Sequence, residues 1–544
     1  MRAPSGSAKA RARCSGCRSR ATCSRASPCP GSSRPRPWPP RSSKCWRRSL
    51  HRPAFHIGAM SATRAELRQQ ASAAARHLAG LGLGRGDVLA LWLPDGAAWL
   101  QFLFAAAELG VLVVPISTRY RLADAQHVVA VSRARAVVVA TDFLGVDYPG
   151  MARQIQGELS HVTHIVEVAT RDGFFAAGEG APIRERGTPS DLLCTFSTSG
   201  TTGRPKLAPH DQASIAMHSA NVARAFEIRP GDVMLCALPL NGVLGFVQAF
   251  SALAAGAACV LLPVFNAAAA AELIERHEVT HFFGSDSMFA PVLELDARAL
   301  ASWRRGGFAE FVGIGRQVAA RAEEKLGLRL VGLYGSSECF ALMSQQDPAQ
   351  PLPERALAGG DPIAPDIRVR VVDGETGESL PEGRPGELQV AGYNVTPGYL
   401  NNPDATREAF TEDGWFRTGD LAAMRGRGFV YQARMKDSLR LKGYLVDPGE
   451  IEAHLMGYGG IVGAQVVGVN VPGEGDLAVA FVRSGTPAVT EAALLAHCRA
   501  GIAGYKVPRR IVFVDEFPQV QGPNGVKIIK AKLREMARDA LESH

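Results

Sequence analysis

Short apolar segments alternate with amphipathic helical patterns along most of this 544-residue chain. The first helical pattern opens with Thr63 and Glu66, which have the spacing of a capping box. Further segments with the composition of buried strands are Val88–Leu93, Val111–Ile116, Ala136–Ala140, Ile165–Val168, Leu192–Phe196, Val233–Leu238, Ala258–Leu262, His281–Phe283 and Leu330–Leu333. Strands that alternate with helices form parallel sheets covered by helices on both faces, so we predict an α/β fold.

The pattern changes twice towards the C-terminus. From about residue 366, segments typical of strands at Ile367–Val372, Gly386–Ala391 and Gly428–Gln432 are separated by Gly, Pro and Asn turns, which predicts a small β subdomain. The segment 434–544 has strand and helix patterns of its own and a length within the usual range for a domain. We therefore predict a large domain over 51–433 and a smaller α+β C-terminal domain over 434–544.

Residues 1–50 differ from the rest in composition. They hold 13 of the 60 Lys and Arg residues and none of the 52 Asp and Glu residues, so the net charge of +8 conceals an acidic remainder and gives no argument for nucleic acid binding. We predict a disordered or artefactual leader, with Met60 as one internal candidate for the true start. An organellar targeting peptide is the alternative, although seven prolines would interrupt its helix.

The cysteines outside this leader are scattered and lie mostly in apolar surroundings. We interpret them as buried thiols in a reducing compartment, which favours a cytoplasmic protein: Cys194, Cys236, Cys259, Cys339 and Cys498. The apolar run from Trp99 to Ile116 is interrupted by Gln101 and Glu108. It therefore predicts a buried helix and strand rather than a membrane span.

The segment STSGTTGRPK, residues 197–206, directly follows the predicted strand Leu192–Phe196. Its glycines allow backbone N–H groups to turn towards an anion, its hydroxyls can donate to phosphate oxygens, and Lys206 adds a positive charge. No Gly-Lys-Ser/Thr sequence follows, so this is not a Walker A loop. We predict a polyphosphate-binding loop; a flexible linker is the alternative, and the adjoining strand disfavours it.

A second polar segment, Tyr334-Gly335-Ser336-Ser337-Glu338, follows the predicted strand Leu330–Leu333. Ligands bind at the carboxyl ends of strands in open α/β sheets. An aromatic ring can pack on adenine, a hydroxyl can hold a phosphate, and a carboxylate can coordinate Mg²⁺.

Four segments resemble, in order and spacing, those of the adenylate-forming superfamily, which includes acyl-CoA synthetases, peptide-synthetase adenylation domains and firefly luciferase. They are STSGTTGRPK, YGSSE at 334–338, GEL at 386–388 with Gly398-Tyr399, and GWFRTGD at 414–420. Ser337 stands where threonine is usual in the family. The GEL and Gly-Tyr segments are expected to be largely structural.

The resemblance implies ATP, Mg²⁺ and coenzyme A as cofactors, and it implies roles for individual residues. Nucleotide binding falls to Thr198, Ser199, Gly200, Thr201, Thr202, Gly203, Lys206, Tyr334, Gly335, Ser336, Ser337, Asp420 and Arg434. Glu338 and Thr198 would hold the metal. Lys527, Thr198, Lys206, Ser337 and Glu338 would be catalytic.

The resemblance also implies that 434–544 is a mobile lid. Lys436 would be its hinge, and Arg440, Lys442 and Gly443 would serve the CoA half-reaction. The family places its adenylating lysine in Gly-Lys-x-x-Arg. Here Val526 precedes Lys527 and Lys530 replaces the arginine, so Lys530 and Lys532 compete with Lys527 for the role.

The acyl pocket is expected near Asn241, Gly242 and Asp286. Many members of the family carry histidine or an aromatic residue where Gly242 stands, so either the pocket is expected to be roomier here or another residue gates it. Asp286 would either meet a polar substituent of the acid or cap a helix over Ser287–Leu295, and we favour the cap.

The function that the resemblance implies is that of an AMP-forming acid–thiol ligase, an acyl-CoA synthetase of the kind used in fatty acid metabolism. It would activate a carboxylic acid to acyl-AMP, release pyrophosphate and transfer the acyl group to CoA. Loading of a free-standing carrier protein, a luciferase-like oxygenase and a non-catalytic nucleotide-binding paralogue are the alternatives. The motifs do not distinguish medium-chain, branched and aromatic acids, and they leave a homodimer open.

Overall fold

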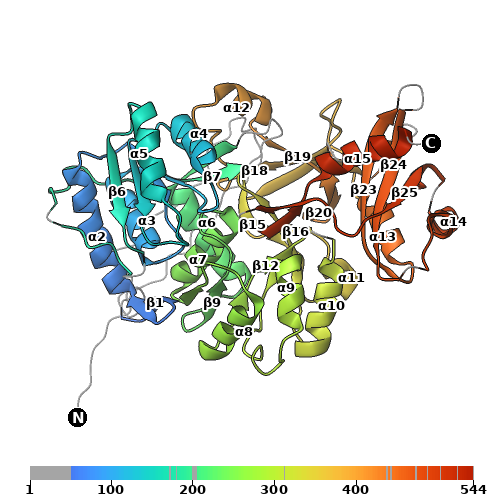
Figure 1. Ribbon diagram of the computed structural model, residues 1–544, viewed down its shortest axis with the longest axis horizontal. Coiled ribbons are helices and arrows are strands. Elements are labelled where there is room, and N and C mark those ends of the chain that lie inside the picture. Colours follow the sequence, from blue (N-terminus) through green and yellow to red (C-terminus); the bar gives the residue numbers. More distant parts are fainter. Residues whose placement is uncertain are drawn as a thin grey trace, which may run out of the picture. The chain divides into compact units, whose positions relative to one another are not determined.

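The computed structural model describes residues 51–170, 173–178, 180–198, 205–311, 313–435, 439–441, 444–446, 448–471, 475–486, 488–502, 504–522 and 525–542 (Figure 1). The predicted leader at 1–50 lies outside the described residues.

A six-stranded sheet carries the strand that leads into the phosphate loop. Its order is β6-β5-β3-β4-β7-β8, parallel except for the antiparallel pair β7–β8. The strands are β3 (Val88–Trp92), β4 (Leu112–Pro115), β5 (Ala136–Ala140), β6 (His164–Val168), β7 (Leu192–Thr198) and β8 (Lys206–Asp211). The predicted strands are confirmed to within two residues, and β8 is an addition.

Helices pack around this sheet (Figure 1); most carry their apolar residues along one side, and the most apolar of them is buried on nearly all sides. They are α2 (Arg64–Gly80), α3 (Ala97–Leu109), α4 (Leu122–Ser132) and α5 (Tyr148–Glu158). The predicted capping box is confirmed: the Thr63 hydroxyl accepts from the N–H of Glu66, and the Glu66 carboxylate accepts from the N–H of Thr63.

A second sheet has the order β11-β9-β10-β1-β2 and is parallel except for β1–β2. Its strands are β1 (Pro53–Ile57), β2 (Met60–Thr63), β9 (Val233–Cys236), β10 (Ala258–Leu261) and β11 (His281–Phe282). The accompanying helices are α6 (Gln212–Ala225), α7 (Val243–Ala255) and α8 (Ala267–Arg276). Strand β1 precedes Met60 and buries Phe55 completely, so folded structure begins before that candidate start.

The predicted β subdomain is part of a longer sheet. Nine strands run in the order β12-β13-β14-β15-β16-β20-β19-β18-β17, of which β12–β14 are parallel and the rest antiparallel. They are β12 (Gly284–Ser285), β13 (Gly307–Ala309), β14 (Val331–Ser336), β15 (Phe340–Gln345), β16 (Gly359–Pro362), β17 (Arg368–Val372), β18 (Pro385–Ala391), β19 (Phe416–Arg425) and β20 (Gly428–Arg434). The helices of this region are α9 (Asp286–Leu293), α10 (Gly315–Leu326), α11 (Leu352–Arg355) and α12 (Pro403–Ala409).

The chain after residue 438 forms its own hydrophobic clusters, which draw on residues from Leu439 to Leu541. Its elements are β21 (Leu439–Leu441), β22 (Tyr444–Val446), α13 (Pro448–Met456), β23 (Ile461–Val471), β24 (Gly475–Ser484), α14 (Glu491–Gly501), η2 (Gly504–Lys506), β25 (Arg510–Phe513), β26 (Gln519–Gly522), β27 (Gly525–Ile528) and α15 (Lys530–Glu542). A separate core is what a separate domain requires, although the exact boundary at residue 434 stays a prediction.

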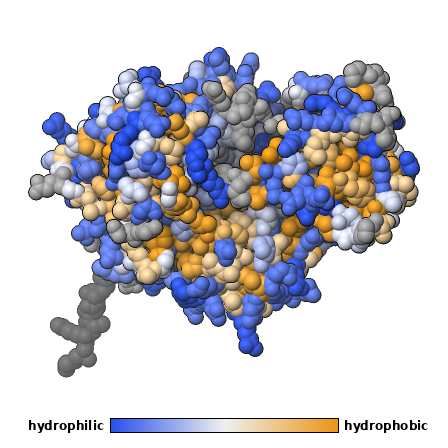
Figure 2. Space-filling model, in the orientation of Figure 1, coloured by the Kyte–Doolittle hydropathy of each residue, from blue (hydrophilic) through white to orange (hydrophobic). Residues whose placement is uncertain are grey.

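The five cysteines of the described residues are free and buried, as the sequence predicts. Among the described helices, none combines the length and the apolar character needed to cross a membrane. On the face drawn in Figure 2, hydrophobic residues gather over the region of α7 to α9, and hydrophilic residues occupy much of the outline.

Candidate active site

The phosphate loop connects two paired strands. Strand β7 extends two residues further than predicted and ends at Thr198, which pairs with Lys206 at the start of antiparallel β8. The pairing places Thr198 and Lys206, both predicted to bind phosphate, opposite each other at the two ends of the loop. The predicted ligands Ser199, Gly200, Thr201, Thr202 and Gly203 lie outside the described residues.

The second polar segment is the turn between β14 and β15. The Ser337 hydroxyl donates to the carbonyl of Ser197 over 3.3 Å, so this turn lies against the end of β7. A Cβ atom at Gly335 would stand 2.3 Å from the carbonyl oxygen of Phe340, so the turn requires glycine at that position. The structure thus brings together two segments that lie about 140 residues apart.

Asp420 and Arg434 face each other across the neighbouring strands β19 and β20. The Arg434 Nε lies 3.0 Å from Asp420 Oδ1 as an ion pair, and the Tyr334 hydroxyl donates to Oδ2. Asp420 is only 2% exposed, and the contact of its Oδ1 with Arg434 does not have the geometry of a hydrogen bond, so this oxygen accepts none from the described residues. A buried carboxylate oxygen without a donor is suited to accept a hydrogen bond from a ligand hydroxyl.

Burial raises the pKa of Asp420, and the charges of Arg434 and Lys527 oppose that rise. Burial also raises the pKa of the Tyr334 hydroxyl, which therefore keeps its proton and donates it to Asp420. For Arg434, burial by itself would lower the pKa, but the Asp420 carboxylate outweighs it and the pKa rises. The arginine is therefore charged whenever Asp420 is ionised.

Tyr334 has a role that its sequence position does not reveal. Its ring is largely buried and meets the ring of Phe429 edge-on, with the centroids 5.0 Å apart, while its hydroxyl orients Asp420. Packing of this ring on adenine stays a prediction.

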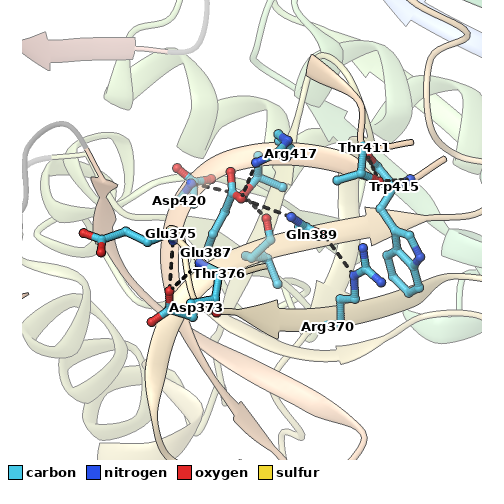
Figure 3. A network of polar contacts seen from close by, with 12 residues as sticks. Arg370, Asp373, Glu375, Thr376, Glu387, Gln389, Thr411, Trp415, Arg417 and Asp420 are labelled. Atoms are coloured by element: carbon cyan, nitrogen blue, oxygen red, sulfur yellow. Dashed lines mark hydrogen bonds and ion pairs between the residues drawn. The ribbon is translucent and has the colours of Figure 1, made fainter. Parts of the chain in front are cut away.

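A row of polar contacts holds β17, β18 and β19 together beside Asp420 (Figure 3). Arg370 donates to Gln389 over 2.8 Å, and Gln389 donates to Glu387 over 3.1 Å. Trp415 of the GWFRTGD segment lies under the Arg370 guanidinium at 4.4 Å from the ring centroid. In this segment, therefore, Trp415 supports the sheet and Asp420 faces Arg434.

On the acyl side, Gly242 immediately precedes α7 and has ordinary extended backbone. The Asn241 Oδ1 is buried without a hydrogen-bond donor among the described residues. The prediction that Asp286 caps a helix is wrong, because Ser285 is the N-cap of α9 and Asp286 is its first residue.

Backbone N–H groups of the protein itself bind the Asp286 carboxylate. Its Oδ1 accepts from the N–H groups of Ser287 and Phe311, and its Oδ2 accepts from that of Ile314. The side chain is fully buried. These bonds occupy both oxygens, so the alternative that Asp286 meets a polar substituent of the acid loses its support.

Lys527 lies on β27 and is exposed. Its positive charge lowers the pKa of Asp420, against the larger effect of burial. Its competitor Lys530 begins α15 and forms an ion pair with Glu452 at 3.3 Å. This contact favours Lys527 as the lysine that faces the site. Lys532 lies exposed on α15. Lys436, Lys442 and Gly443 lie outside the described residues, and for Arg440 only the backbone in β21 is described.

Comparison with known proteins decides the family. The family described as AMP-binding enzyme matches residues 43–400, and its C-terminal domain matches 450–522. The chain belongs to the AMP-binding enzyme family.

Relatives of this AMP-binding enzyme include acyl-CoA ligases. A feruloyl-CoA synthase of Amycolatopsis sp is 29% identical over 91% of this chain and 98% of its own length. The mitochondrial medium-chain acyl-CoA ligase ACSF2 of Danio rerio is 30% identical over 88% of this chain and 84% of its own. The crystal structure of ATP-bound MatB from Rhodopseudomonas palustris superposes with a TM-score of 0.82 at 26% identity, covering 90% of this chain and 97% of that one. The predicted fold class is confirmed.

Sequence reasoning missed His210 and His218. The ring of Phe340 is stacked between them, with centroids 3.8 Å from His210 and 4.7 Å from His218. Burial lowers the pKa of His210 to about 3 and that of His218 to about 4, so both are neutral at physiological pH. The neutral His210 donates from Nε2 to the Ser337 carbonyl over 2.8 Å and thus holds the second polar turn. The available signal was its position four residues after Lys206.

Glu338 is suited to bind a metal together with phosphates. Its Oε1 accepts a hydrogen bond from the Tyr399 hydroxyl over 2.9 Å, and the side chain is only partly buried. Within the described ranges, no group of three or more His, Cys, Asp or Glu residues is arranged to hold a metal by itself. One carboxylate with a nearby hydroxyl fits Mg²⁺, which typically binds through one or two protein oxygens and substrate phosphates.

Proposed function

We propose that this AMP-binding enzyme is an AMP-forming acid–CoA ligase. The observation that carries the proposal is the convergence of two polar segments, around Lys206 and Glu338, beside the buried pair Asp420–Arg434. Such a site supplies cationic and hydroxyl groups for a polyphosphate at one end and carboxylate and guanidinium groups for a ribose at the other.

In the first half-reaction, an oxygen of the substrate carboxylate attacks the α-phosphorus of ATP, and the bond to the departing pyrophosphate breaks. Thr198, Lys206 and the loop residues Ser199, Gly200, Thr201, Thr202 and Gly203 bind the pyrophosphate. Ser337 and Lys527 hold oxygens of the α-phosphate and the carboxylate. Charge stabilisation and in-line positioning provide most of the catalysis.

At the other end of the nucleotide, Asp420 accepts from the ribose hydroxyls through the Oδ1 that lacks a donor, and Arg434 adds a second contact. Tyr334 keeps Asp420 oriented. Glu338 and Thr198 would hold Mg²⁺ together with the phosphates, and the metal would supply positive charge to the departing pyrophosphate.

In the second half-reaction, the CoA thiol attacks the acyl carbonyl, AMP leaves, and the thiol proton is released. The lid at 434–544 turns about Lys436, which withdraws Lys527 and brings Arg440, Lys442 and Gly443 to the thiol path. One site then performs both reactions in turn.

The acid is to be found by exchange of labelled pyrophosphate into ATP across a panel of carboxylic acids. Two relatives are named for feruloyl-CoA and medium-chain acyl-CoA formation, so the panel begins with aromatic and medium-chain acids. CoA is then added with the best acid, and a carrier protein serves as the competing acceptor. Lack of exchange with every acid would support a non-catalytic paralogue instead.

Lys527→Ala tests the two-step assignment. We expect it to lower adenylate formation by about 10³-fold, because a positive charge at the reacting phosphate is lost. Thioester formation from supplied acyl-AMP should stay within a few-fold of the wild type. Lys532→Ala is the matched control and should leave both steps unchanged. Equal loss of both steps in Lys527→Ala contradicts the assignment.

A further inference from the structure

The segment Asn394–Leu400 forms hydrogen bonds to both polar segments of the site. On the side of the Glu338 turn, the Thr396 N–H donates to the Glu338 carbonyl over 2.7 Å, and the Asn394 amide donates to the Cys339 carbonyl over 2.7 Å. On the side of β8, the Leu400 N–H donates to the Leu207 carbonyl over 2.9 Å. We call this segment the clasp.

Thr396 also joins the two sides within a single residue. Its hydroxyl donates to the Pro209 carbonyl of β8 over 2.8 Å, while its N–H holds Glu338. Thr396 is buried. Because the clasp is bonded to both backbones, it fixes the spacing between β8, where Lys206 lies, and the turn that carries Glu338.

Tyr399 contacts both functional side chains directly. Its hydroxyl donates to Glu338 Oε1 over 2.9 Å, and the Lys206 Nζ lies 4.3 Å from the centroid of its ring. The side chain is 8% exposed. A cation over an aromatic face and a hydroxyl on a carboxylate are both attractive contacts.

The position of the Tyr399 ring is itself fixed from a third side. The Tyr399 N–H donates to the Thr406 hydroxyl on α12 over 2.9 Å. The preceding Gly398 has a φ of +143°, and a Cβ there would lie 2.5 Å from the Thr406 methyl carbon, so the chain turns closely against α12 at this point. The ring therefore has little freedom to follow Lys206 or Glu338 if either moves.

We propose that Tyr399 is a positioning residue that holds Glu338 and Lys206 at a set separation, so that metal and pyrophosphate are bound as one unit. This inference rests on the proposed function, in which Glu338 binds Mg²⁺ and Lys206 binds pyrophosphate. The hydroxyl orients the metal ligand and the ring orients the lysine, so the two contacts can be removed one at a time.

Two variants separate these contacts. Tyr399→Phe removes the hydroxyl and keeps the ring under Lys206, whereas Tyr399→Leu removes both. Tyr393→Phe is the matched control, because it removes another partly buried tyrosine hydroxyl. That hydroxyl accepts from Asn221 over 2.7 Å and contacts His218 rather than Glu338 or Lys206. Thermal unfolding of all three variants measures the stability cost that a purely structural role would produce.

The deciding measurement is binding. Mn²⁺ replaces Mg²⁺, α,β-methylene-ATP replaces ATP, and free Mn²⁺ is followed by electron paramagnetic resonance. Tyr399→Phe should raise the Mn²⁺ Kd about 10-fold, as expected when a group that orients a metal ligand is lost. Its affinity for the analogue without metal should be unchanged. Tyr399→Leu should weaken both, and Tyr393→Phe neither.

Glu338→Gln distinguishes the ways in which the proposal can fail. If Glu338→Gln weakens Mn²⁺ binding and Tyr399→Phe does not, the role of Tyr399 is refuted while the proposed metal site stands. If neither variant weakens Mn²⁺ binding, the assignment of Glu338 to the metal fails, and the inference fails with it.

Discussion

Two buried aspartates, one beside Arg434 and one near the predicted acyl pocket, can be compared directly. Asp420 is 2% exposed and Asp286 is fully buried. Asp420 keeps one oxygen without a hydrogen-bond donor among the described residues, next to a charged arginine. Both oxygens of Asp286 accept from backbone N–H groups.

The contrast shows that burial of a carboxylate does not by itself mark a ligand site. What distinguishes the two aspartates is whether an oxygen remains for a ligand after the protein's own donors have been counted. Asp420 meets this condition and Asp286 does not. Four substitutions can break or sharpen the distinction.

Asp420→Asn should have the largest effect. The amide keeps the shape of the side chain but removes the charge that binds Arg434 and accepts from the ribose, so we expect the KM for ATP to rise about 30- to 100-fold. The KM for the acid should change little. Pyrophosphate exchange at varied ATP measures both. A normal KM for ATP would remove Asp420 from the nucleotide site.

Asp286→Asn should damage stability rather than nucleotide binding. Its amide would direct an N–H₂ group at backbone donors, and loss of one charge-assisted hydrogen bond costs about 2 kcal/mol. Urea unfolding measures this loss, and the KM for ATP is the internal control. A large rise in that KM with unchanged stability would show that Asp286 binds the nucleotide and is not a structural residue.

Gly242→Phe tests the acyl side directly. An aromatic ring next to Asn241 should narrow the space for the acid and shift preference towards smaller acids by about 10-fold in kcat/KM. The acid panel with pyrophosphate exchange gives the ratio, and the KM for ATP should match the wild type. An unchanged ranking of acids would move the acyl pocket away from Gly242.

Asp95→Asn should leave nucleotide binding unchanged, and its effect on stability should depend on pH. Asp95 Oδ1 accepts from the N–H of Leu240 over 2.9 Å, beside Asn241. Burial raises the pKa of Asp95 from 3.8 to about 7, although the Leu240 N–H lowers it in part. Between pH 4 and 7 the folded protein therefore holds a proton that the unfolded chain releases, and stability falls as the pH rises.

The asparagine variant lacks this titration. Its free energy of unfolding relative to the wild type should rise from pH 4 to pH 7 and level off above pH 7, by about 1.4 kcal/mol for each unit of pKa shift. Urea unfolding at four pH values checks the slope. A constant difference across this window would show that Asp95 is ionised in the folded protein.

The sequence predicted the local elements well, because periodicity and caps such as Thr63 act over a few residues. The resemblance of its motifs to those of a known family also implied that the two polar segments meet, which the contact of Ser337 with Ser197 confirms. The sequence did not predict the nine-stranded sheet, since β15, β16 and β19 lie in stretches with turns and glycines, where pairing with distant strands decides the structure. The part played by Ser285 was missed for a simpler reason, because two adjacent residues were both good caps.

Side-chain partners far apart in the chain could not be predicted. Tyr334 and Asp420 are 86 residues apart, and Tyr399 is 61 residues from Glu338. Both tyrosines belong to segments that the sequence singled out, but which atom each hydroxyl meets depends on the packing of three strands and a turn. For the same reason, the internal use of Asp286 was visible only once Phe311 and Ile314 were placed beside it.

Strand β1 has a consequence for which strand forms the edge of the second sheet. It lies between β10 and β2 in the second sheet and buries Phe55. Without residues 51–59, β10 would become an unprotected edge strand with unpaired N–H and C=O groups beside an exposed apolar surface. Edges of this kind recruit strands from other molecules and lead to aggregation. The few residues before Met60 therefore move the edge of this sheet from β10 to β2, and a strand as short as β2 offers few unpaired groups to another chain.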